Sequence, residues 1–430
     1  MYVSNLALTD FRNYHREILQ LHPGITTFIG ENGQGKTNIV EAVDYLATLG
    51  SHRVSSDSAL IRQGAQAAVV QARVVTGGSA TTVEVEIFAG RANRARINRG
   101  HARPAEILGI VRTVLFSPED LDLVRGDPAG RRAFLDGIMV QLRPRLAGVK
   151  SEYDRVLRQR GALLKSMQKA RRRGARLDFA ALEVWDQQLA HLGGQIVSAR
   201  SRIVAGLRPF VRHYYALVSG NSARARIDYA ANTDRGAFTL PAPEAIAGDP
   251  DWDDDAAHLA ASDSDSQAGP VALIAAHERE LEDAAACEQR IANLLTERRE
   301  DEVTRGVNLV GPHRDELRLA LGSLPAKGYA SHGESWSFAL ALRLASWQLL
   351  RTDASGQWAG GSEPILILDD VFAELDARRR QRLAHLVREA DQVLVTQAVG
   401  DDLPAELSGD RFLVRSGTVT PLGNEDARNE

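Results

Sequence analysis

The sequence contains little cysteine and no long apolar run. Its one cysteine in 430 residues, Cys287, excludes a disulfide framework and a cysteine-rich metal site. No apolar stretch approaches the length of about eighteen residues that a membrane span requires. Residues 1–6 lack the basic and apolar regions of a signal peptide, so we expect a cytoplasmic protein with no membrane partner. The remaining composition, 44% hydrophobic and 25% charged, is typical of a folded protein of about two domains.

Charge is distributed unevenly along the chain, although the net charge is only −4. Between Arg91 and Arg176 there are 21 Lys and Arg against 8 Asp and Glu, whereas between Glu244 and Asp283 there are 12 acids and one base. A local basic surface binds phosphate backbones whatever the total charge of the chain. The basic run at 171–173 would equally suit a helix face that is only solvated.

An eight-residue segment fits the pattern G-x-x-x-x-G-K-[ST] of a phosphate-binding loop. It lies between a strand-like run, 25–29, and a helix-like run, 38–49, which is the required context. Glycines allow successive backbone N–H groups to face phosphates, Lys36 can reach the β- and γ-phosphates, and the Thr37 hydroxyl can bind Mg²⁺. The alternative is a glycine-rich turn without a ligand. The predicted cofactor-binding residues of the loop are Gly30, Glu31, Asn32, Gly33, Gln34, Gly35, Lys36 and Thr37.

Two carboxylates follow a second apolar run far downstream. Residues 364–368 read as a strand buried on both faces, and Asp369 and Asp370 come directly after it. A carboxylate at this end of a parallel strand lies beside the phosphate loop in doubly wound folds, so Asp369 is the second predicted Mg²⁺ ligand after Thr37. Asp370 is predicted to orient or activate the attacking water. Considered without the upstream loop, the two acids are equally compatible with a simpler interpretation. In that interpretation they are solvent-exposed residues at the end of a buried strand and bind nothing.

The chain alternates between strand-rich and helix-rich parts. Residues 2–8 and 17–21 predict a strand pair, and 67–75 and 81–88 predict a hairpin. Further strand-like and helix-like segments alternate from residue 308, and they include a buried strand at 392–396. Nothing past residue 424 is expected to be ordered.

The middle of the chain has the pattern of packed amphipathic helices. The predicted helices are 131–142, 147–168, 179–218 and 272–299. The acidic, small-residue-rich segment 243–269 is expected to be a flexible excursion. We therefore predict an α/β fold with a discontinuous head, 1–125 and 305–424, and an inserted α-helical arm, 126–304. Prolines and glycines interrupt any sustained heptad, which argues against a long coiled coil.

Several motifs occur together and in order, and together they resemble the RecF family. They are residues 8–14, 30–37, 116–121, 130–136, 310–317, 331–334 and 368–376. The family is similar to the heads of P-loop ABC-type ATPases such as SMC proteins, with a mixed or parallel sheet flanked by helices. The resemblance implies two heads that close around two ATP molecules as an ATP-dependent homodimer. It also implies binding of double-stranded and gapped single-stranded DNA, and cooperation with RecR, RecO and RecA in DNA repair and replication.

The resemblance also assigns roles to residues outside the loop. Ser331 would contact the γ-phosphate bound to the opposite subunit, and Gly333 would allow close backbone approach. Asp376 would communicate across the dimer, while Arg12 and Asn13 would reach the nucleotide phosphates. For Arg12 and Asp376, ordinary surface charge is the competing interpretation.

The chain departs from the wider ABC-type pattern at two phosphate sensors. Pro118 and Glu119 stand where related heads place a glutamine, and Thr396 and Gln397 stand where they often place a histidine. Slow, weak ATP hydrolysis is the expected result. Glu334 replaces a frequent glutamine in the signature segment, and the sequence suggests no chemical role for His313 or Arg314.

Three functions are compatible with these residues. The favoured one is an ATP-dependent DNA-binding protein of gapped-DNA repair, with Lys36, Asp369 and Asp370 as the catalytic residues. A structural scaffold that binds ATP with negligible hydrolysis is the first alternative. A P-loop small-molecule kinase is the second, and the wide separation of the loop from Asp369 disfavours it.

Overall fold

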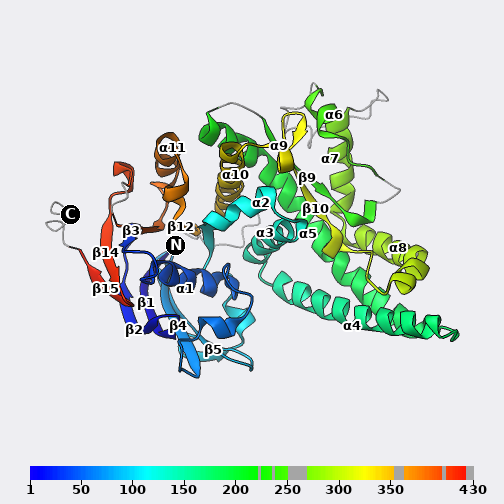
Figure 1. The fold of residues 1–430 in the computed structure, drawn as a ribbon, viewed down its shortest axis with the longest axis horizontal. Helices are drawn as coiled ribbons and strands as arrows, with labels where there is room; N and C mark the ends of the chain where they lie inside the picture. Colours follow the sequence, from blue (N-terminus) through cyan, green and yellow to red (C-terminus); the bar gives the residue numbers. More distant parts are fainter. Residues whose placement is uncertain (221–223, 235–237, 250–268, 353–362, 400–402, 423–430) are drawn as a thin grey trace. The chain divides into compact units, whose positions relative to one another are not determined.

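The computed structural model describes residues 1–220, 224–234, 238–249, 269–352, 363–399 and 403–422 (Figure 1). The chain divides into two compact units. The head unit comprises Met1–Leu121, Leu217–Gly220 and Ala339–Glu430, and the arm unit comprises Asp122–Ala216 and Asn221–Phe338. The predicted division placed residues 305–338 with the head, whereas they group here with the arm unit. The end of the chain past residue 424, which we expected to be unordered, lies outside the described residues.

The head unit contains a six-stranded sheet that is parallel except at one edge. Its order is β15 (Thr418–Pro421), β14 (Asp410–Arg415), β3 (Gly24–Ile29), β13 (Gln392–Gln397), β12 (Ile365–Asp369) and β8 (Thr113–Phe116). Every residue of β12 and β13 is buried, as expected for strands of a parallel sheet that is covered on both faces. The predicted buried strands at 364–368 and 392–396 are therefore confirmed.

A second head sheet has six antiparallel strands. Its order is β2 (Tyr14–Gln20), β1 (Tyr2–Phe11), β4 (Ala67–Thr76), β5 (Ser79–Phe88), β6 (Arg94–Ile97) and β7 (Gly100–Ala102). The predicted strand pair and hairpin near the amino terminus are confirmed. Helix α1 (Lys36–Thr48) contacts strands of both sheets, and its Ile39, Val43 and Leu46 are fully buried in the shared core. The phosphate-binding loop is thus anchored between two sheets.

The other head helix is α11 (Ala377–Val387), and helix α10 (His332–Arg351) begins in the arm unit and ends in the head unit. The arm unit contains α3 (Pro128–Leu142), α4 (Leu146–Arg172), α6 (Pro243–Ala247), α7 (Pro270–Leu281), α8 (Ala284–Arg305) and α9 (Ala326–Tyr329). It also contains all of α2 (Leu121–Arg125) except Leu121, and α5 (Ala180–Ser219) as far as Ala216. The predicted helices at 131–142, 147–168 and 179–218 are confirmed as α3, α4 and α5. Helix α5 continues through Pro209.

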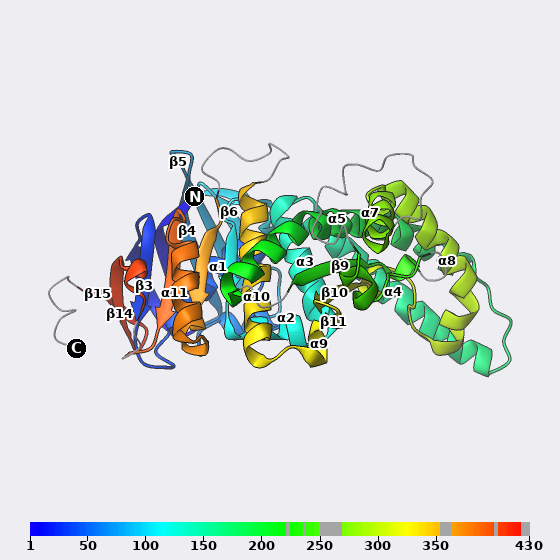
Figure 2. The same ribbon diagram turned by 90° about the horizontal axis from the view of Figure 1, so that it is seen from above.

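Two expectations for the arm differ from the structure. The single helix expected at 272–299 is two helices, α7 and α8, which are separate ribbons in Figure 2. The Asp283 carboxylate between them accepts hydrogen bonds from the backbone N–H groups of Ala285 and Ala286, and so caps a new helix start. The expected helical arm, 126–304, also contains the strand β9 (Ala225–Ala230). It forms a small antiparallel sheet with β10 (Glu316–Leu321) and β11 (Leu324–Pro325), which lie where strand-like segments were expected.

The acidic segment expected to be a flexible excursion, 243–269, is described only in part. Its first part is helix α6, whose Ile246 is buried against Val271 and Ile274 of α7. The contacts of Ile246 in this small apolar cluster hold the start of the segment against α7. Residues 250–268 lie outside the described residues.

Candidate nucleotide site

The phosphate-binding loop connects β3 to α1 in a conformation that requires glycine. Gly33 and Gly35 have φ values of 80° and 117°, in the region that favours glycine. A Cβ at Gly35 would lie 2.6 Å from Asn13 Nδ2 and 2.8 Å from the Tyr14 hydroxyl oxygen. The Tyr14 hydroxyl donates to the Gly35 carbonyl at 3.0 Å, and burial raises the pKa of Tyr14, so the phenol remains a donor. The conformation of the loop is therefore stabilised by a side chain of β2 as well as by its own glycines.

Lys36 folds back over the loop that precedes it. Its Nζ donates to the carbonyl oxygens of Gly30 at 2.8 Å and Glu31 at 3.1 Å, and to Asn32 Oδ1 at 3.4 Å. The residue is 4% exposed, so a nearly buried ammonium lies at the mouth of the loop, beside the amino-terminal end of α1. Backbone N–H groups, a helix dipole and this ammonium together fit an anionic phosphate chain. The expected phosphate site is therefore chemically consistent.

Thr37 and Asp369, the two predicted Mg²⁺ ligands, meet across 332 residues of sequence. Thr37 Oγ1 donates to Asp369 Oδ1 at 2.9 Å, and Thr396 Oγ1 donates to the same oxygen at 2.7 Å. Asp369 is 4% exposed, and burial raises its pKa, with the charge of Asp370 adding to the effect. A hydroxyl and a carboxylate are oxygen ligands of the kind that Mg²⁺ prefers.

Few protein ligands are available for such a cation. Among the described residues, no group of three or more His, Cys, Asp or Glu could hold a metal ion. A cation at Thr37 and Asp369 would therefore depend on phosphate oxygens and water for its remaining ligands, which is the usual arrangement for Mg²⁺ at a nucleotide. Thr37 and Asp369 therefore fit a cation that binds together with a nucleotide.

Asp370, the predicted water-orienting residue, shares the Thr396 hydroxyl with Asp369. Its backbone is left-handed, with φ 51°, and its side chain is half-buried. The backbone N–H of Asp370 donates to Thr396 Oγ1 at 2.9 Å, and Oδ1 lies 3.3 Å from the same hydroxyl. Thr396, which stands near the position of the missing histidine, thus contacts both carboxylates.

His52 lies beside Asp369 and was not predicted. Its Nε2 is 4.0 Å from Asp369 Oδ2, its side chain is 15% exposed, and neither ring nitrogen has a hydrogen-bond partner in the part of the chain that the structure describes. Both nitrogens of this partly buried imidazole are therefore available to hydrogen-bond a bound ligand. No spacing rule links residues 52 and 369, so sequence reasoning had no signal for this contact.

The amino-terminal pair, Arg12 and Asn13, is tied to the protein around the loop. Arg12 donates to both oxygens of the fully buried Glu41 carboxylate, at 2.8 and 2.6 Å. Asn13 Nδ2 donates to the Gln34 carbonyl at 2.8 Å, and Asn13 Oδ1 accepts from Asn38 Nδ2 at 2.8 Å. Asn13 therefore supports the loop backbone, while the Arg12 guanidinium is paired with a carboxylate.

The signature segment, with Ser331 and Gly333, belongs to the arm unit and starts helix α10. The Ser331 N–H donates to Glu334 Oε2 at 2.9 Å, and the Glu334 N–H donates to Ser331 Oγ at 3.3 Å. This reciprocal pair is a capping box, which accepts Glu or Gln at its third helical position. The departure at Glu334 is therefore compatible with an intact helix start, and Ser331 is exposed.

Asp376, expected to communicate across a dimer, caps helix α11 of the head unit. Its Oδ1 accepts from the Arg379 N–H at 2.9 Å, and its carboxylate also pairs with the Arg379 guanidinium. The Arg379 N–H lowers the pKa of Asp376, so it stays charged. Its side chain remains 51% exposed.

His313 and its neighbours occupy a buried polar cluster in the arm unit. The Tyr153 hydroxyl lies 2.8 Å from His313 Nδ1. Asp315 is 1% exposed, accepts from the Asn232 N–H at 2.7 Å and contacts the Tyr229 hydroxyl. The motif for which the sequence suggested no chemistry therefore joins α4, β9 and the start of β10.

Comparison with known proteins agrees with this geometry. The family model described as RecF/RecN/SMC N terminal domain matches residues 2–401. The DNA replication and repair protein RecF of Beutenbergia cavernae is 54% identical over 97% of this chain and 99% of its own length, and that of Streptomyces avermitilis is 49% identical over 97% and 99%. Among the described residues, no helix is long and apolar enough to cross a membrane.

Solved structures share the fold. The structure described as the recombination mediator protein RecF-ATP in the RecFOR pathway has a TM-score of 0.77 at 22% identity, covering 98% of both chains. An SMC head bound to the C-winged helix domain of ScpA has a TM-score of 0.50 at 15% identity, covering 100% of both chains. The predicted α/β ATPase head fold is confirmed. With the family model matching nearly the whole sequence and relatives about half identical, this chain belongs to the RecF family.

Proposed function

We propose that this protein is an ATP-dependent DNA-binding protein of recombinational repair and replication, with weak ATP hydrolysis. The observation that carries the proposal is the meeting of Thr37 with Asp369 beside the glycine-rich loop, because it assembles a phosphate and Mg²⁺ site from segments 332 residues apart. Relatives about half identical over nearly the whole chain carry the name DNA replication and repair protein. A solved relative with the same fold is described with ATP.

Each residue has a defined part in this mechanism. Lys36 exchanges its contacts with loop carbonyls for the β- and γ-phosphates, and Thr37 and Asp369 hold the cation. Bound Mg²⁺ neutralises charge on the phosphate oxygens. The half-buried Asp370 carboxylate accepts a hydrogen bond from the attacking water and orients it. With no glutamine in the loop at 116–120 and Thr396 near the usual histidine position, we expect hydrolysis to be slow.

The second half of each site would come from a second copy of the chain. The exposed Ser331 hydroxyl and the amino-terminal end of α10 offer an anion-binding surface to the γ-phosphate of the opposite subunit. ATP then favours the dimer because its γ-phosphate contacts both subunits, and hydrolysis removes that differential affinity. The dimer would bind duplex DNA near single-strand gaps and assist RecR and RecO in placing RecA.

Sedimentation velocity with a non-hydrolysable ATP analogue tests the composite site. Ser331→Arg should abolish analogue-induced dimers, because the longer cation occupies the space of the γ-phosphate contact. Ser323→Arg, which adds the same side chain at another exposed serine of the arm unit, is the control and should still form dimers. Undiminished dimers in Ser331→Arg would reject the role in the opposite subunit.

The scaffold alternative rests on the same missing sensors. If the protein binds ATP but hardly hydrolyses it, single-turnover phosphate release will stay at background with and without gapped DNA. Release that Asp370→Asn slows, with nucleotide affinity retained, would support the ATPase instead.

A further inference from the structure

One stretch of helix α4 and the residues after it carries basic side chains and no acid. Residues 155–177 contain nine Arg and Lys and no Asp or Glu. Charge of one sign over this length repels itself unless partners are present. The structure shows which of the nine have partners.

Three of the nine are paired within the arm unit. Arg160 is fully buried between the carboxylates of Asp186 and Glu302. Arg155 pairs with Glu152 one turn earlier, and Arg171 pairs with Glu300 of α8. The other six are exposed and have no ion-pair partner among the described residues: Arg158, Lys165, Lys169, Arg172, Arg173 and Arg176.

Four of these six form a line along the solvent face of α4. Arg158, Lys165, Lys169 and Arg172 are spaced seven, four and three residues apart, which returns to the same face of an α-helix. We call these four residues the basic stripe. The buried residues of the helix, including Val156, Leu164 and Met167, fall on its opposite face.

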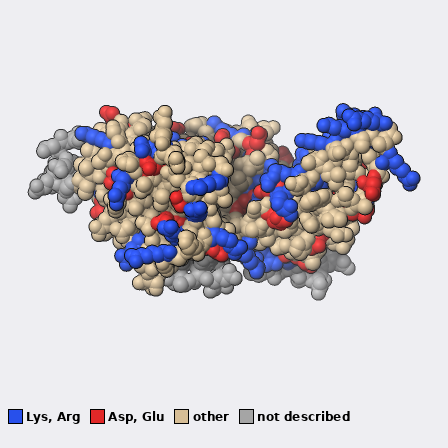
Figure 3. All heavy atoms as spheres, turned by 90° about the horizontal axis from the view of Figure 1, so that it is seen from below, with Lys and Arg blue, Asp and Glu red and all other residues tan. Residues whose placement is uncertain are grey.

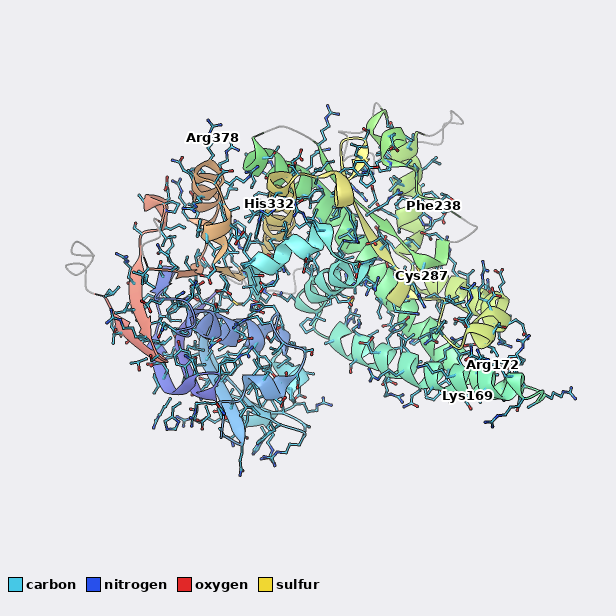
Figure 4. The ribbon with its side chains drawn as sticks, viewed as in Figure 1. Lys169, Arg172, Phe238, Cys287, His332 and Arg378 are labelled. Carbon is cyan, nitrogen blue, oxygen red and sulfur yellow. The ribbon has the colours of Figure 1, made fainter. Side chains whose placement is uncertain are left out.

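Figure 3 shows blue atoms gathered at the right-hand end of the surface, and Figure 4 labels Lys169 and Arg172 near the carboxyl-terminal end of α4. At a rise of about 1.5 Å per residue, the stripe extends over roughly 21 Å. The amino-terminal part of α4 is different, because Lys150 there pairs with Asp154. The unpaired positive charge is therefore confined to the later turns of the helix.

We propose that the basic stripe is a contact site for the phosphate backbone of duplex DNA. This inference rests on the proposed function and adds a surface of the arm unit to it. One strand of a duplex carries a charge about every 3.4 Å along the axis, so roughly six phosphates face a stripe of this length. The four unpaired cations of the stripe can each approach a phosphate of this regular series. Because they are already held on a helix, binding does not require a flexible segment to become ordered.

The composition of the helix selects duplex rather than single-stranded DNA. Proteins that hold single strands stack bases on aromatic side chains, and residues 154–178 contain no aromatic residue. The contact of the basic stripe is therefore with the backbone, independent of sequence and sensitive to salt.

The test compares full-length proteins on a fluorescently labelled duplex, with the ATP analogue, over a series of KCl concentrations. The charge-reversal variant carries R158E, K165E, K169E and R172E. We expect its dissociation constant to rise at least tenfold at low salt. The magnitude of the slope of log association constant against log [KCl] should decrease by about 2 to 4, since each lost phosphate contact removes about 0.9 from it. The control A162Q/S166Q alters the same stretch of helix but keeps every charge, and should bind like the unaltered protein.

The outcomes separate this inference from the proposed function. If the unaltered protein binds duplex and the reversal variant binds with the same affinity and slope, the stripe is overturned while the proposed function stands. If the unaltered protein binds no duplex in any nucleotide state, both are overturned. The fraction of protein that the analogue converts to dimers, measured by sedimentation, should be the same for the unaltered protein, the charge-reversal variant and the control.

A second variant guards against misfolding of the first. The neutral variant R158Q/K165Q/K169Q/R172Q removes four charges without adding like charges, and should show about half of the loss of affinity with an unchanged circular dichroism spectrum. Loss of binding to anionic phospholipid vesicles with intact duplex binding would overturn the assignment to DNA.

Discussion

Arg343 donates two hydrogen bonds to one carboxylate oxygen of Asp120, at 3.0 and 2.5 Å. Arg343 lies on α10, the helix that the signature segment begins, and Asp120 lies in the loop after β8, where related heads carry a sensor of the γ-phosphate. Asp120 also accepts from the Ser117 N–H at 3.1 Å, which fixes the loop. One charged pair therefore links a nucleotide-side loop to the signature helix.

Breaking this pair should destabilise the head. Asp120→Asn removes the charge from a side chain that is 5% exposed, and we expect the free energy of unfolding to fall by about 2 kcal/mol. In a double-mutant cycle with Arg343→Gln, urea unfolding should give a coupling energy of about 1 to 3 kcal/mol. Glu119→Gln, at an exposed position of the same loop, should change stability by less than about 0.5 kcal/mol. A coupling near zero would show that the two residues act separately.

His52 should affect turnover more than nucleotide binding. Its unpartnered nitrogens beside Asp369 are positioned to hydrogen-bond a phosphate oxygen or the attacking water, so we expect His52→Ala to slow single-turnover hydrolysis by about 10- to 100-fold. The dissociation constant for ATP should change less than about threefold, because the loop backbone and Lys36 are intact. His101→Ala, at an exposed histidine of β7, is the matched control. Hydrolysis at the normal rate in His52→Ala would rule out this role.

His313 should make the arm sensitive to acid. Burial lowers the pKa of His313 from 6.5 to about 4, so between these values the unfolded chain binds a proton that the folded chain does not. Stability from this group is therefore lost as pH falls from about 6.5 to 4, by about 3 kcal/mol. The difference in unfolding free energy between the unaltered protein and His313→Asn should shrink over that range.

Asp315 acts in the opposite direction, because burial raises its pKa to about 6. Its contribution is the same in both proteins of the His313 comparison, so it cancels from the difference. Two unfolding curves that stay parallel from pH 7 to pH 4 would contradict the assignment to His313.

Two helical glycines should respond in opposite ways to alanine. A Cβ at Gly194 of α5 would lie 2.5 Å from the Ala284 carbonyl oxygen and 2.8 Å from the Glu288 nitrogen, so α8 would have to move. We expect Gly194→Ala to lower the free energy of unfolding by about 2 to 3 kcal/mol. Gly137→Ala in α3 meets no atom within 4 Å and should raise it by about 0.5 to 1 kcal/mol. Thermal unfolding measures both, and an equal effect of the two changes would contradict the close packing of α5 on α8.

The nucleotide site was predictable because its signals are local. The loop at 30–37 is recognisable from glycine and lysine residues at fixed spacing. The apolar run before Asp369 is typical of a strand that is buried on both faces. Parallel strands then bring their carboxyl ends to one edge of a sheet, which is why Thr37 and Asp369 could be paired from the sequence.

What escaped prediction depends on contacts between distant segments. The strand β9 pairs with β10 about ninety residues later, and nothing near residue 225 reveals that partner. The apolar spacing of α7 continues into α8, so periodicity joined two helices that the cap at Asp283 separates. The pairing of Arg12 with Glu41 also comes from tertiary packing, so no local pattern in the sequence indicated it.

The order of strands in the head sheet has a consequence for biosynthesis. β3, which leads into the phosphate-binding loop, has β13 and β14 as its two neighbours, and β13 begins 363 residues after β3 ends. At about 5 to 20 residues per second, a ribosome needs roughly 20 to 70 s to deliver that neighbour. Throughout this interval β3 lacks both of its partners in the sheet, so the head sheet forms only after nearly the whole chain has been synthesised.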